Sequence, residues 1–212
     1  MTTKKIIIYV LMAMFGISFS AYAQEKTNAA DTMGKKILVA FFSRAGENYN
    51  VGYIEKGNTR IVAEIISEHA GGKLFHIETE TPYPDTYKEC VEIAKQEKEN
   101  NVRPALKGDI SVEDYDMIFI GYPNWWGDMP MAVYTFIEKH NWQGKTVIPF
   151  CTHEGSGLSS TEKKLSKACA GSILLKGIAI QGSTAQKSKD RTEQAITGWL
   201  DGLFVKQPNS QK

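Results

Sequence analysis

Short segments rich in apolar residues recur along this chain and alternate with segments of helical periodicity. A run of four to eight apolar residues predicts a strand buried on both faces, because a strand with one solvated face alternates apolar with polar residues. Five such strands separated by helices require crossover connections, so the sequence predicts an α/β fold with a parallel sheet. Ile37–Phe42 is the continuous run of this kind, and four further short segments rich in apolar residues predict the other strands: Leu74–Ile77, Met117–Tyr122, Thr146–Cys151 and Leu174–Ile180.

The intervening segments predict the helices. Apolar residues at helical spacing favour a helix from Asn58 to Ala70, which Gly71 and Gly72 end. Three further helices are expected, the first carrying Tyr87, Val91 and Ala94, the second opened by Pro130, and the third begun by Asp190 and Glu193.

Two local signals refine this pattern. Ser159 followed by Glu162 predicts a capping box at the start of the helix after the fourth strand. Pro149 lies inside that strand, where it is awkward because proline cannot donate to the ladder of a central strand.

The first 23 residues have the pattern of a secretory signal peptide. Lys4 and Lys5 precede a nearly continuous apolar run from Ile6 to Phe19, and Ala21-Tyr22-Ala23 has the small-x-small pattern of a cleavage site. About 14 apolar residues are fewer than the ~20 that a membrane span needs. We therefore expect an exported protein, periplasmic or secreted, with no membrane span after cleavage. The expected organisation is a signal peptide at 1–23, a polar lead-in at 24–34, one domain at 35–204 and a short tail at 205–212.

The charge balance excludes broad electrostatic attraction to nucleic acid. The chain has 25 Lys and Arg against 24 Asp and Glu, a formal charge of +1, which becomes −1 without Lys4 and Lys5. Such a chain has no extended positive field for a polyanion. Three cysteines are too few for a disulfide scaffold, and their pairing stays open.

The loop after the first strand suits a phosphate. Ser43-Arg-Ala-Gly46 precedes Gly57-Asn-Thr59 at the expected start of the first helix, where hydroxyls and free amides bind anions. Arg44 could add a charge-assisted contact. Ordinary helix capping by Asn58 is the simpler alternative.

The loop after the third strand carries two adjacent tryptophans. The segment is Pro123-Asn-Trp-Trp-Gly127, and Trp125 and Trp126 cannot both point into one core. A flat heteroaromatic ligand could stack on one of them. A hydrophobic plug or a partner-binding patch are the alternatives.

The loop after the fourth strand is rich in glycine and hydroxyls. Its residues are Thr152-His-Glu-Gly-Ser-Gly157, and Gly155 and Gly157 allow the backbone to approach a ligand closely. His153 and Glu154 invite a metal interpretation, but no other His or Cys has ligand spacing with them, so we predict no metal site.

These three loops, in this order, resemble those of the flavodoxin-like family over about residues 35–204. The resemblance implies a three-layer α/β sandwich whose five-stranded parallel sheet has the order 2-1-3-4-5, and one bound FMN. It implies a phosphate held by the first loop and a ring flanked by the other two. The site residues carried over by position are Ser43, Arg44, Gly46, Asn58, Thr59, Pro123, Asn124, Trp125, Trp126, Gly127, Thr152, His153, Glu154, Gly155, Ser156 and Gly157.

The resemblance departs from the family pattern in the first loop. Residues 47–56 interrupt it, so either Asn48 or Thr59 could close it, and we favour Thr59 because helical periodicity begins just after it.

Two classes of function follow. The first is an FMN-dependent redox protein, either an electron carrier for a partner protein or a reductase of the NAD(P)H:quinone type acting on a quinone-like acceptor. The second is a flavin-free binding module that uses the tryptophan pair and the insertion around residues 48–57 as a partner surface. The sequence leaves the oligomeric state open.

Overall fold

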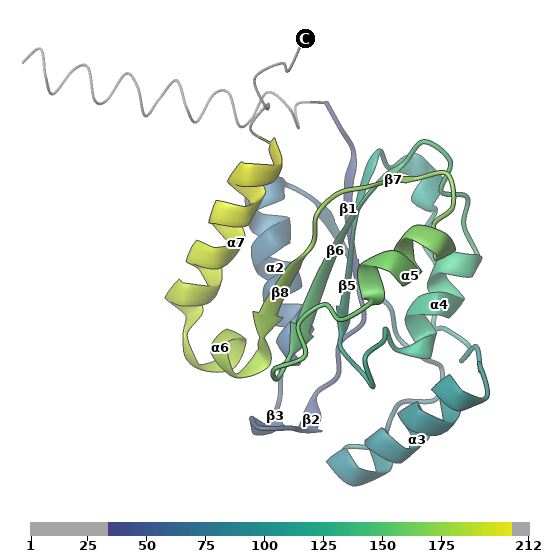
Figure 1. Ribbon diagram of the computed structural model, residues 1–212, viewed down its shortest axis with the longest axis vertical. Helices are drawn as coiled ribbons and strands as arrows, with labels where there is room; N and C mark the ends of the chain where they lie inside the picture. The colour runs from purple at the N-terminus through teal and green to yellow at the C-terminus, as the bar shows by residue number, and fades with distance from the viewer. Residues whose placement is uncertain (1–33, 205–212) are drawn as a thin grey trace, which may run out of the picture. The chain divides into compact units, whose positions relative to one another are not determined.

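The computed structural model describes residues 34–204. The expected signal peptide, the lead-in before Gly34 and the tail after residue 204 lie outside the described residues. The described part is built on one parallel sheet (Figure 1). In spatial order its strands are β4 (Lys73–His76), β1 (Ile37–Phe41), β5 (Met117–Pro123), β6 (Thr146–His153) and then β7 (Ile173–Leu174) with β8 (Ile178–Gln181), both of which pair with β6.

The predicted sheet order is confirmed. When β7 and β8 are taken as one interrupted strand, the order is 2-1-3-4-5 and all pairings are parallel. Strand β1 lies between β4 and β5, with Val39 opposite both Leu74 and Phe119. All five residues of β1 are buried, as its continuous apolar run predicted.

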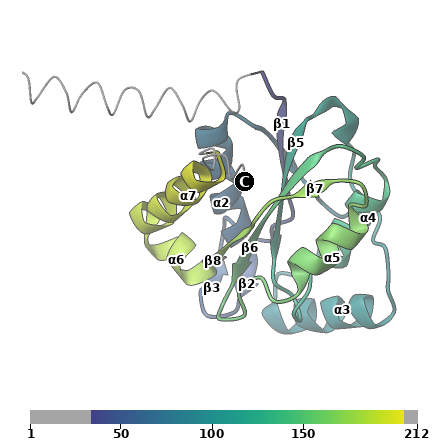
Figure 2. The same ribbon diagram turned by 45° about the horizontal axis from the view of Figure 1, so that its top comes forward.

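Helices cover both faces of the sheet and one of its ends (Figures 1 and 2). On one face lie α2 (Asn58–Ala70), α6 (Gly182–Lys187) and α7 (Lys189–Phe204), and on the other lie α4 (Met131–Glu138) and α5 (Thr161–Ala168). Helix α3 (Tyr87–Glu99) lies instead beyond the end of the sheet toward which the strands point, beside a hairpin of β2 (Gly46–Asn48) and β3 (Gly52–Ile54). A 3-10 turn, η1 (Val112–Asp114), precedes β5.

Pro149 explains why the fifth strand is interrupted. The backbone oxygen of Val147 accepts a hydrogen bond from the amide of Leu175, so the odd-numbered residues of β6 present their backbone groups to the fifth strand. Pro149 has no N–H to offer there. The ladder breaks opposite it, and Gly177 fits because a Cβ at that position would lie 2.7 Å from the proline ring.

The predicted capping box is wrong. Helix α5 begins at Thr161, its N-cap is Ser160, and no side chain caps it. Ser159 has φ 50° and its hydroxyl donates to the backbone oxygen of Ser156. Glu162 instead accepts from the amide of Gly177, because the bulge beside Pro149 leaves that amide without a strand partner.

The other helix predictions hold with small shifts. Helix α2 spans Asn58–Ala70 as expected, and Gly71 ends it with φ 70°. Pro130 occupies the N-cap position of α4 and not its first helical position. Helix α6 and the hairpin β2–β3 were not predicted. Residues 47–56, predicted as an interruption of the first loop and, in the alternative function, as part of a partner surface, form most of this hairpin.

Candidate functional site

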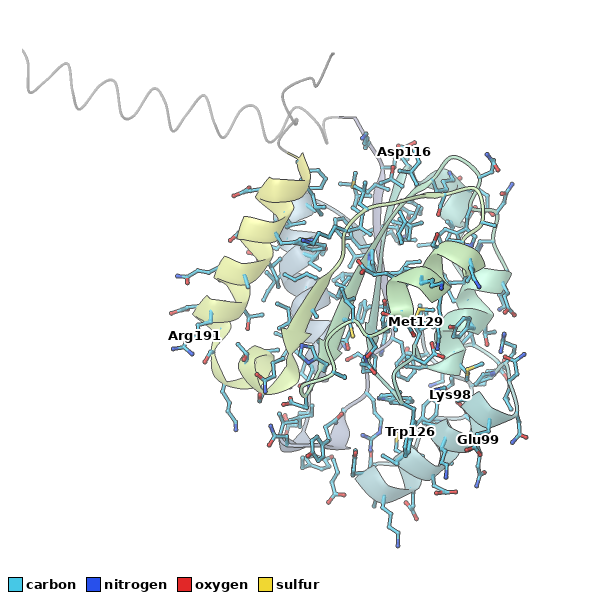
Figure 3. All side chains as sticks on the ribbon, in the orientation of Figure 1. Lys98, Glu99, Asp116, Trp126, Met129 and Arg191 are labelled. Atoms are coloured by element: carbon cyan, nitrogen blue, oxygen red, sulfur yellow. The ribbon has the colours of Figure 1, made fainter. Side chains whose placement is uncertain are left out.

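A cavity of about 320 Å³ opens at the edge of the sheet where the strands end. Figure 3 places Trp126 at this end, beside Lys98 of α3, and Asp116, which precedes β5, at the opposite end. Ten of the sixteen predicted site residues line the cavity: Arg44, Asn58, Pro123, Asn124, Trp125, Trp126, Thr152, His153, Glu154 and Ser156. The other six do not line it: Ser43, Gly46, Thr59, Gly127, Gly155 and Gly157.

The first loop packs tightly against the start of α2. A Cβ at Gly57 would lie 2.3 Å from Ser43 Oγ and 2.5 Å from the backbone oxygen of Arg44, so only glycine fits there. The amide of Arg60 donates to Ser43 Oγ at 3.0 Å. Ser43 therefore satisfies an amide of the helix N-terminus from outside the helix.

Arg44 holds neighbouring segments together. Its Nε and Nη2 donate to the backbone oxygen of Pro84 at 3.0 and 2.7 Å, and Nη2 also donates to that of Asp85 at 2.6 Å. Its Nη1 donates to the backbone oxygen of Glu47. These bonds tie the hairpin to the segment before α3, so a phosphate contact from Arg44 would require some of them to be exchanged.

Gly46 lies at the same contact between the hairpin and the segment before α3. It has φ 85°, and a Cβ there would lie 2.8 Å from the backbone oxygen of Asp85. The glycine lets the hairpin approach the segment before α3 closely, and it is buried away from the cavity.

Two buried hydroxyls join the first and third predicted loops. Thr59 Oγ1 and Thr152 Oγ1 lie 2.7 Å apart, and the two residues are 1% and 2% exposed. This bond fixes the start of α2 to the end of β6. Thr59 therefore positions the first loop and does not itself line the cavity.

The tryptophan pair occupies a tight turn. The backbones of Trp125 and Asp128 exchange two hydrogen bonds, at 2.9 and 3.0 Å. Trp126 and Gly127 between them have φ 55° and 71°, a left-handed pair that glycine adopts freely and tryptophan rarely. Strained backbone of this kind clusters at functional sites.

The two tryptophan rings separate as expected. The ring of Trp125 packs edge-on against Phe42 and Tyr83, at 5.3 and 5.2 Å between centroids. Trp126 is 51% exposed, and its indole N–H donates to the backbone oxygen of Val91 on α3. Both rings line the cavity, one from the core side and one from its rim.

Asn124 connects the second predicted loop to the third. Its amide nitrogen donates to the backbone oxygen of Gly157 and to Ser159 Oγ, at 2.8 and 2.9 Å. Its amide oxygen accepts from the amide of Gly127. The side chain thus holds both loops in one arrangement.

The loop after β6 carries a carboxylate with several partners. Glu154 accepts from the amide and the hydroxyl of Ser183 at the start of α6, and from the side chains of Gln181 and Asn50. Asn50 lies at the turn of the hairpin, so Glu154 anchors the hairpin to the rest of the site.

His153 borders the cavity next to this carboxylate. Its Nδ1 accepts from the amide of Gly155, which has φ 119°. Burial lowers the pKa of His153 below its ordinary value, although the neighbouring Glu154 opposes this shift. The imidazole is therefore neutral at pH 7.

Five lining residues were not predicted as ligand-binding residues, and a sixth, Asn48, was considered only as the alternative to Thr59 for closing the first loop. The five are Tyr49, Tyr87, Cys90, Val91 and Ala94. They come from the hairpin and from α3. The apolar face of α3 was predicted from the spacing of its residues, but no ligand was assigned to it. Its approach through Pro82 and Pro84 was the available signal that this helix leaves the regular layer.

The side chains and helices of residues 34–204 also bear on metal binding, membrane spanning and disulfide formation. This part of the chain has no cluster of three or more His, Cys, Asp or Glu side chains arranged to hold a metal ion. None of its helices is long and apolar enough to cross a membrane. Cys90, Cys151 and Cys169 are free thiols, all buried, and burial raises the pKa of Cys90 to about 11.

Comparisons with known proteins agree with this geometry. A candidate flavoprotein from Bacteroides eggerthii is 31% identical, with a TM-score of 0.62, and the match covers 82% of this chain and 100% of that one. A candidate flavoprotein from Bacteroides uniformis is 30% identical, with a TM-score of 0.59, over 77% and 99% of the two chains. A Lactobacillus acidophilus flavoprotein in complex with FMN is 22% identical, with a TM-score of 0.54, over 73% and 98%.

No curated protein sequence gives a significant match. A family model described as flavodoxin, however, matches residues 36–201, nearly the whole described part of the chain. The chain therefore belongs to the flavodoxin family, and its strands have the order that the sequence predicted.

Proposed function

We propose that this protein binds FMN in the cavity at the end of the sheet and takes part in a redox reaction. The observation that carries the proposal is the meeting of three loops, after β1, β5 and β6, around one cavity of about 320 Å³. Open parallel sheets bind ligands at this edge, and the volume lies in the usual range for small-molecule sites. Membership of the flavodoxin family and the FMN complex of the Lactobacillus acidophilus relative support the choice of ligand.

The start of α2 suits the phosphate end of FMN. The N-cap residue, Gly57, makes no side-chain cap, and Asn58, the first helical residue, lines the cavity. Amides at such an end carry partial positive charge that stabilises an anion. Ser43 and Thr59 act here as positioning residues, since each is already bonded within the protein.

The loops after β5 and β6 suit the ring. Pro123, Trp125 and Trp126 offer flat apolar surfaces, and Thr152 and the neutral His153 offer polar atoms on the adjacent strand. Bound FMN would supply the electron chemistry. The side chains here would orient the ring, exclude water from it and limit the charge around it.

The shape of the cavity favours reduction of a small acceptor over simple electron transfer. A carrier needs only an exposed ring edge, whereas this cavity is also lined by Tyr49 of the hairpin and by Tyr87 and Val91 of α3. The electron carrier is the competing version, and the flavin-free binding module is the other class.

The first test is retention of flavin. The purified protein is incubated with FMN, desalted and measured by absorbance, and we expect about one flavin per chain. A colourless protein would refute the proposal and favour the binding module. Titration with dithionite then distinguishes the two redox versions, because a carrier is reduced in two one-electron steps and a reductase is reduced in one two-electron step.

A tryptophan exchange locates the flavin. Trp126→Phe should raise the fluorescence of bound FMN, because the indole on the cavity rim quenches a stacked flavin. Trp199→Phe is the matched control, since Trp199 is on α7 and bonds to the backbone oxygen of Lys176, away from the cavity. Equal fluorescence in the two variants and the parent protein would place the ring elsewhere.

We also propose that the protein is exported. The support is the residue pattern at 1–23, with Lys4 and Lys5 before an apolar run and Ala23 at the expected cleavage point. Expression of the full-length chain, followed by fractionation and N-terminal sequencing, tests this. Recovery of an uncleaved cytoplasmic protein would refute it.

A further inference from the structure

The apolar face of α3 has an unusual place in this fold. A helix in a parallel α/β protein normally buries its apolar face against the sheet. Helix α3 lies beyond the strand ends instead (Figures 1 and 2), and its residues Tyr87, Val91 and Ala94 line the cavity. This face is therefore a wall of the binding site.

The hairpin adds a second aromatic ring to this wall. Tyr49 is the first residue of the turn of the hairpin, and its ring lies 6.0 Å from that of Tyr87 between centroids, with the ring planes tilted by 33°. Tyr49 is 62% exposed in the protein alone and also lines the cavity. Two tyrosines and a valine, from the hairpin and α3, thus bound one part of the cavity.

The position of Tyr49 is fixed from both sides. On one side Arg44 donates to the backbone oxygen of Glu47, and Glu47 accepts from the amide of Tyr87. On the other side Asn50 donates to Glu154 at 2.9 Å. These contacts hold the hairpin against both α3 and the loop after β6, so the wall is built into the fold.

Charge complementarity indicates what this wall accepts. Among the described residues that line the cavity, Arg44 and Glu154 are the charged side chains. Arg44 is bonded to backbone oxygens of the adjoining segments, and Glu154 is bonded to four donors. The lining therefore offers no free cation for a carboxylate or a diphosphate, but it offers aromatic and aliphatic surface.

We propose that Tyr49, Tyr87, Val91 and Ala94 form a subsite for an uncharged, planar aromatic molecule of the quinone class. The subsite adjoins the loop after β5, since the indole N–H of Trp126 donates to the backbone oxygen of Val91. Aromatic rings stack favourably on tyrosine faces, and an uncharged ligand leaves no unpaired charge in the cavity. The inference rests on the proposed function for the ligand's role as an acceptor, but binding at the wall can be measured separately.

The test is an equilibrium titration with menadione, an uncharged naphthoquinone, into the oxidised FMN-loaded protein. Binding is followed by tryptophan fluorescence and by the flavin absorbance spectrum, so no turnover is needed. Loss of one stacked ring is expected to weaken menadione binding roughly 3- to 10-fold in Tyr49→Ala and in Tyr87→Ala. The affinity for FMN, measured in a separate titration, should stay unchanged.

Tyr53→Ala is the matched control. Tyr53 is on the same hairpin and is 68% exposed, but it does not line the cavity. Its removal should leave the affinities for menadione and FMN unchanged. A loss of menadione affinity in Tyr53→Ala as large as that in Tyr49→Ala would mean that the hairpin acts as a whole, and would overturn the assignment.

A comparison of ligands keeps the proposal testable if a tyrosine variant fails to fold. The unaltered protein should bind menadione at least tenfold more tightly than 1,4-naphthoquinone-2-sulfonate, since the wall has no free cation for the sulfonate. Equal affinities would refute the proposed selectivity for an uncharged ligand.

The outcomes separate this inference from the proposed function. A protein that holds FMN but does not bind menadione refutes the subsite alone. Tyrosine variants that lose FMN affinity show that the wall covers the flavin, which also refutes the subsite. A protein that does not bind FMN refutes the proposed function, and the same menadione titration of the flavin-free protein then tests the wall directly.

Discussion

Removal of one hydroxyl from the Thr59–Thr152 pair should destabilise the protein more than removal of both. The two hydroxyl oxygens lie 2.7 Å apart and both residues are almost completely buried. Neither hydroxyl has another hydrogen-bond partner among the described residues. Thr59→Val is nearly isosteric, so its main effect is to leave the hydroxyl of Thr152 without a partner.

The size of the effect follows from this burial. An unsatisfied buried hydroxyl costs about 1–3 kcal/mol, whereas replacing both partners by apolar groups of the same shape is close to neutral. Thr59→Val and Thr152→Val should therefore each lower the free energy of unfolding by about 1–3 kcal/mol. The double variant should lie closer to the parent protein than the sum of the two single changes predicts.

The assay is urea denaturation of the four proteins in a double-mutant cycle, followed by circular dichroism. Equal m-values are needed for the comparison, because a changed m-value signals a changed denatured or native state. Strictly additive single effects would refute the reasoning, since they would mean that the two hydroxyls are not coupled.

Three further changes test other contacts. Gly57→Ala should weaken FMN binding strongly, because its Cβ would lie 2.3 Å from Ser43 Oγ, while Gly198→Ala on α7, with open space around it, should bind FMN normally in the same titration. Burial lowers the pKa of His76 from its ordinary 6.5, so below about pH 6.5 the unfolded chain binds more protons and the free energy of unfolding falls as pH decreases. His76→Gln should make this fall less steep. Urea titrations from pH 7.5 to 5 would measure it. Asp128→Asn should lower the free energy of unfolding by about 1–3 kcal/mol, because it removes the charge that faces Lys164. In a protein that already carries Lys164→Met, Asp128→Asn should have no such effect, as thermal or urea denaturation would measure.

The regular elements were predictable because their signals are local. The buried strand β1 was predicted by its continuous apolar run, and α2 was predicted by its periodicity and its terminal glycine. The edge strand β4 was also predicted, although its residues are exposed or half-buried. The break in the fifth strand was not predictable in the same way. It depends on the register that brings Leu174 and Ile178 to either side of Pro149, and that register is a property of two strands together.

The capping box failed for a related reason. Ser159 and Glu162 have the required spacing, but each finds a stronger partner from elsewhere in the fold. Ser159 accepts from Asn124, which connects two loops, and Glu162 accepts from an amide exposed by the bulge at Gly177. A motif of two residues cannot indicate such competition.

The candidate site was likewise predictable only in part. The three loops were predicted because a parallel sheet gathers the carboxyl ends of its strands at one edge. The wall formed by Tyr49 and α3 was not, because nothing in the spacing of Tyr87, Val91 and Ala94 distinguishes a face that packs on a core from one that lines a cavity. The path of the chain around Arg44 decides whether this face packs on the core or lines the cavity. Arg44 bonds to residues about 40 positions later in the sequence, so the spacing within α3 does not reveal it.

The polar side chains predicted as ligands have a common structural role. Ser43, Thr59, Asn124 and Glu154 all use their polar atoms to bond one loop to another or to a helix end. A loop held in this way loses little conformational entropy when a ligand arrives, so its binding free energy is less reduced by ordering. In the proposed flavin site, the motif residues would therefore support binding chiefly by fixing the loops beforehand. Direct contacts with FMN would then come from backbone amides at the start of α2 and from the flat surfaces of Pro123 and the tryptophans. For this reason, substitution of a motif residue should reduce stability and FMN affinity together.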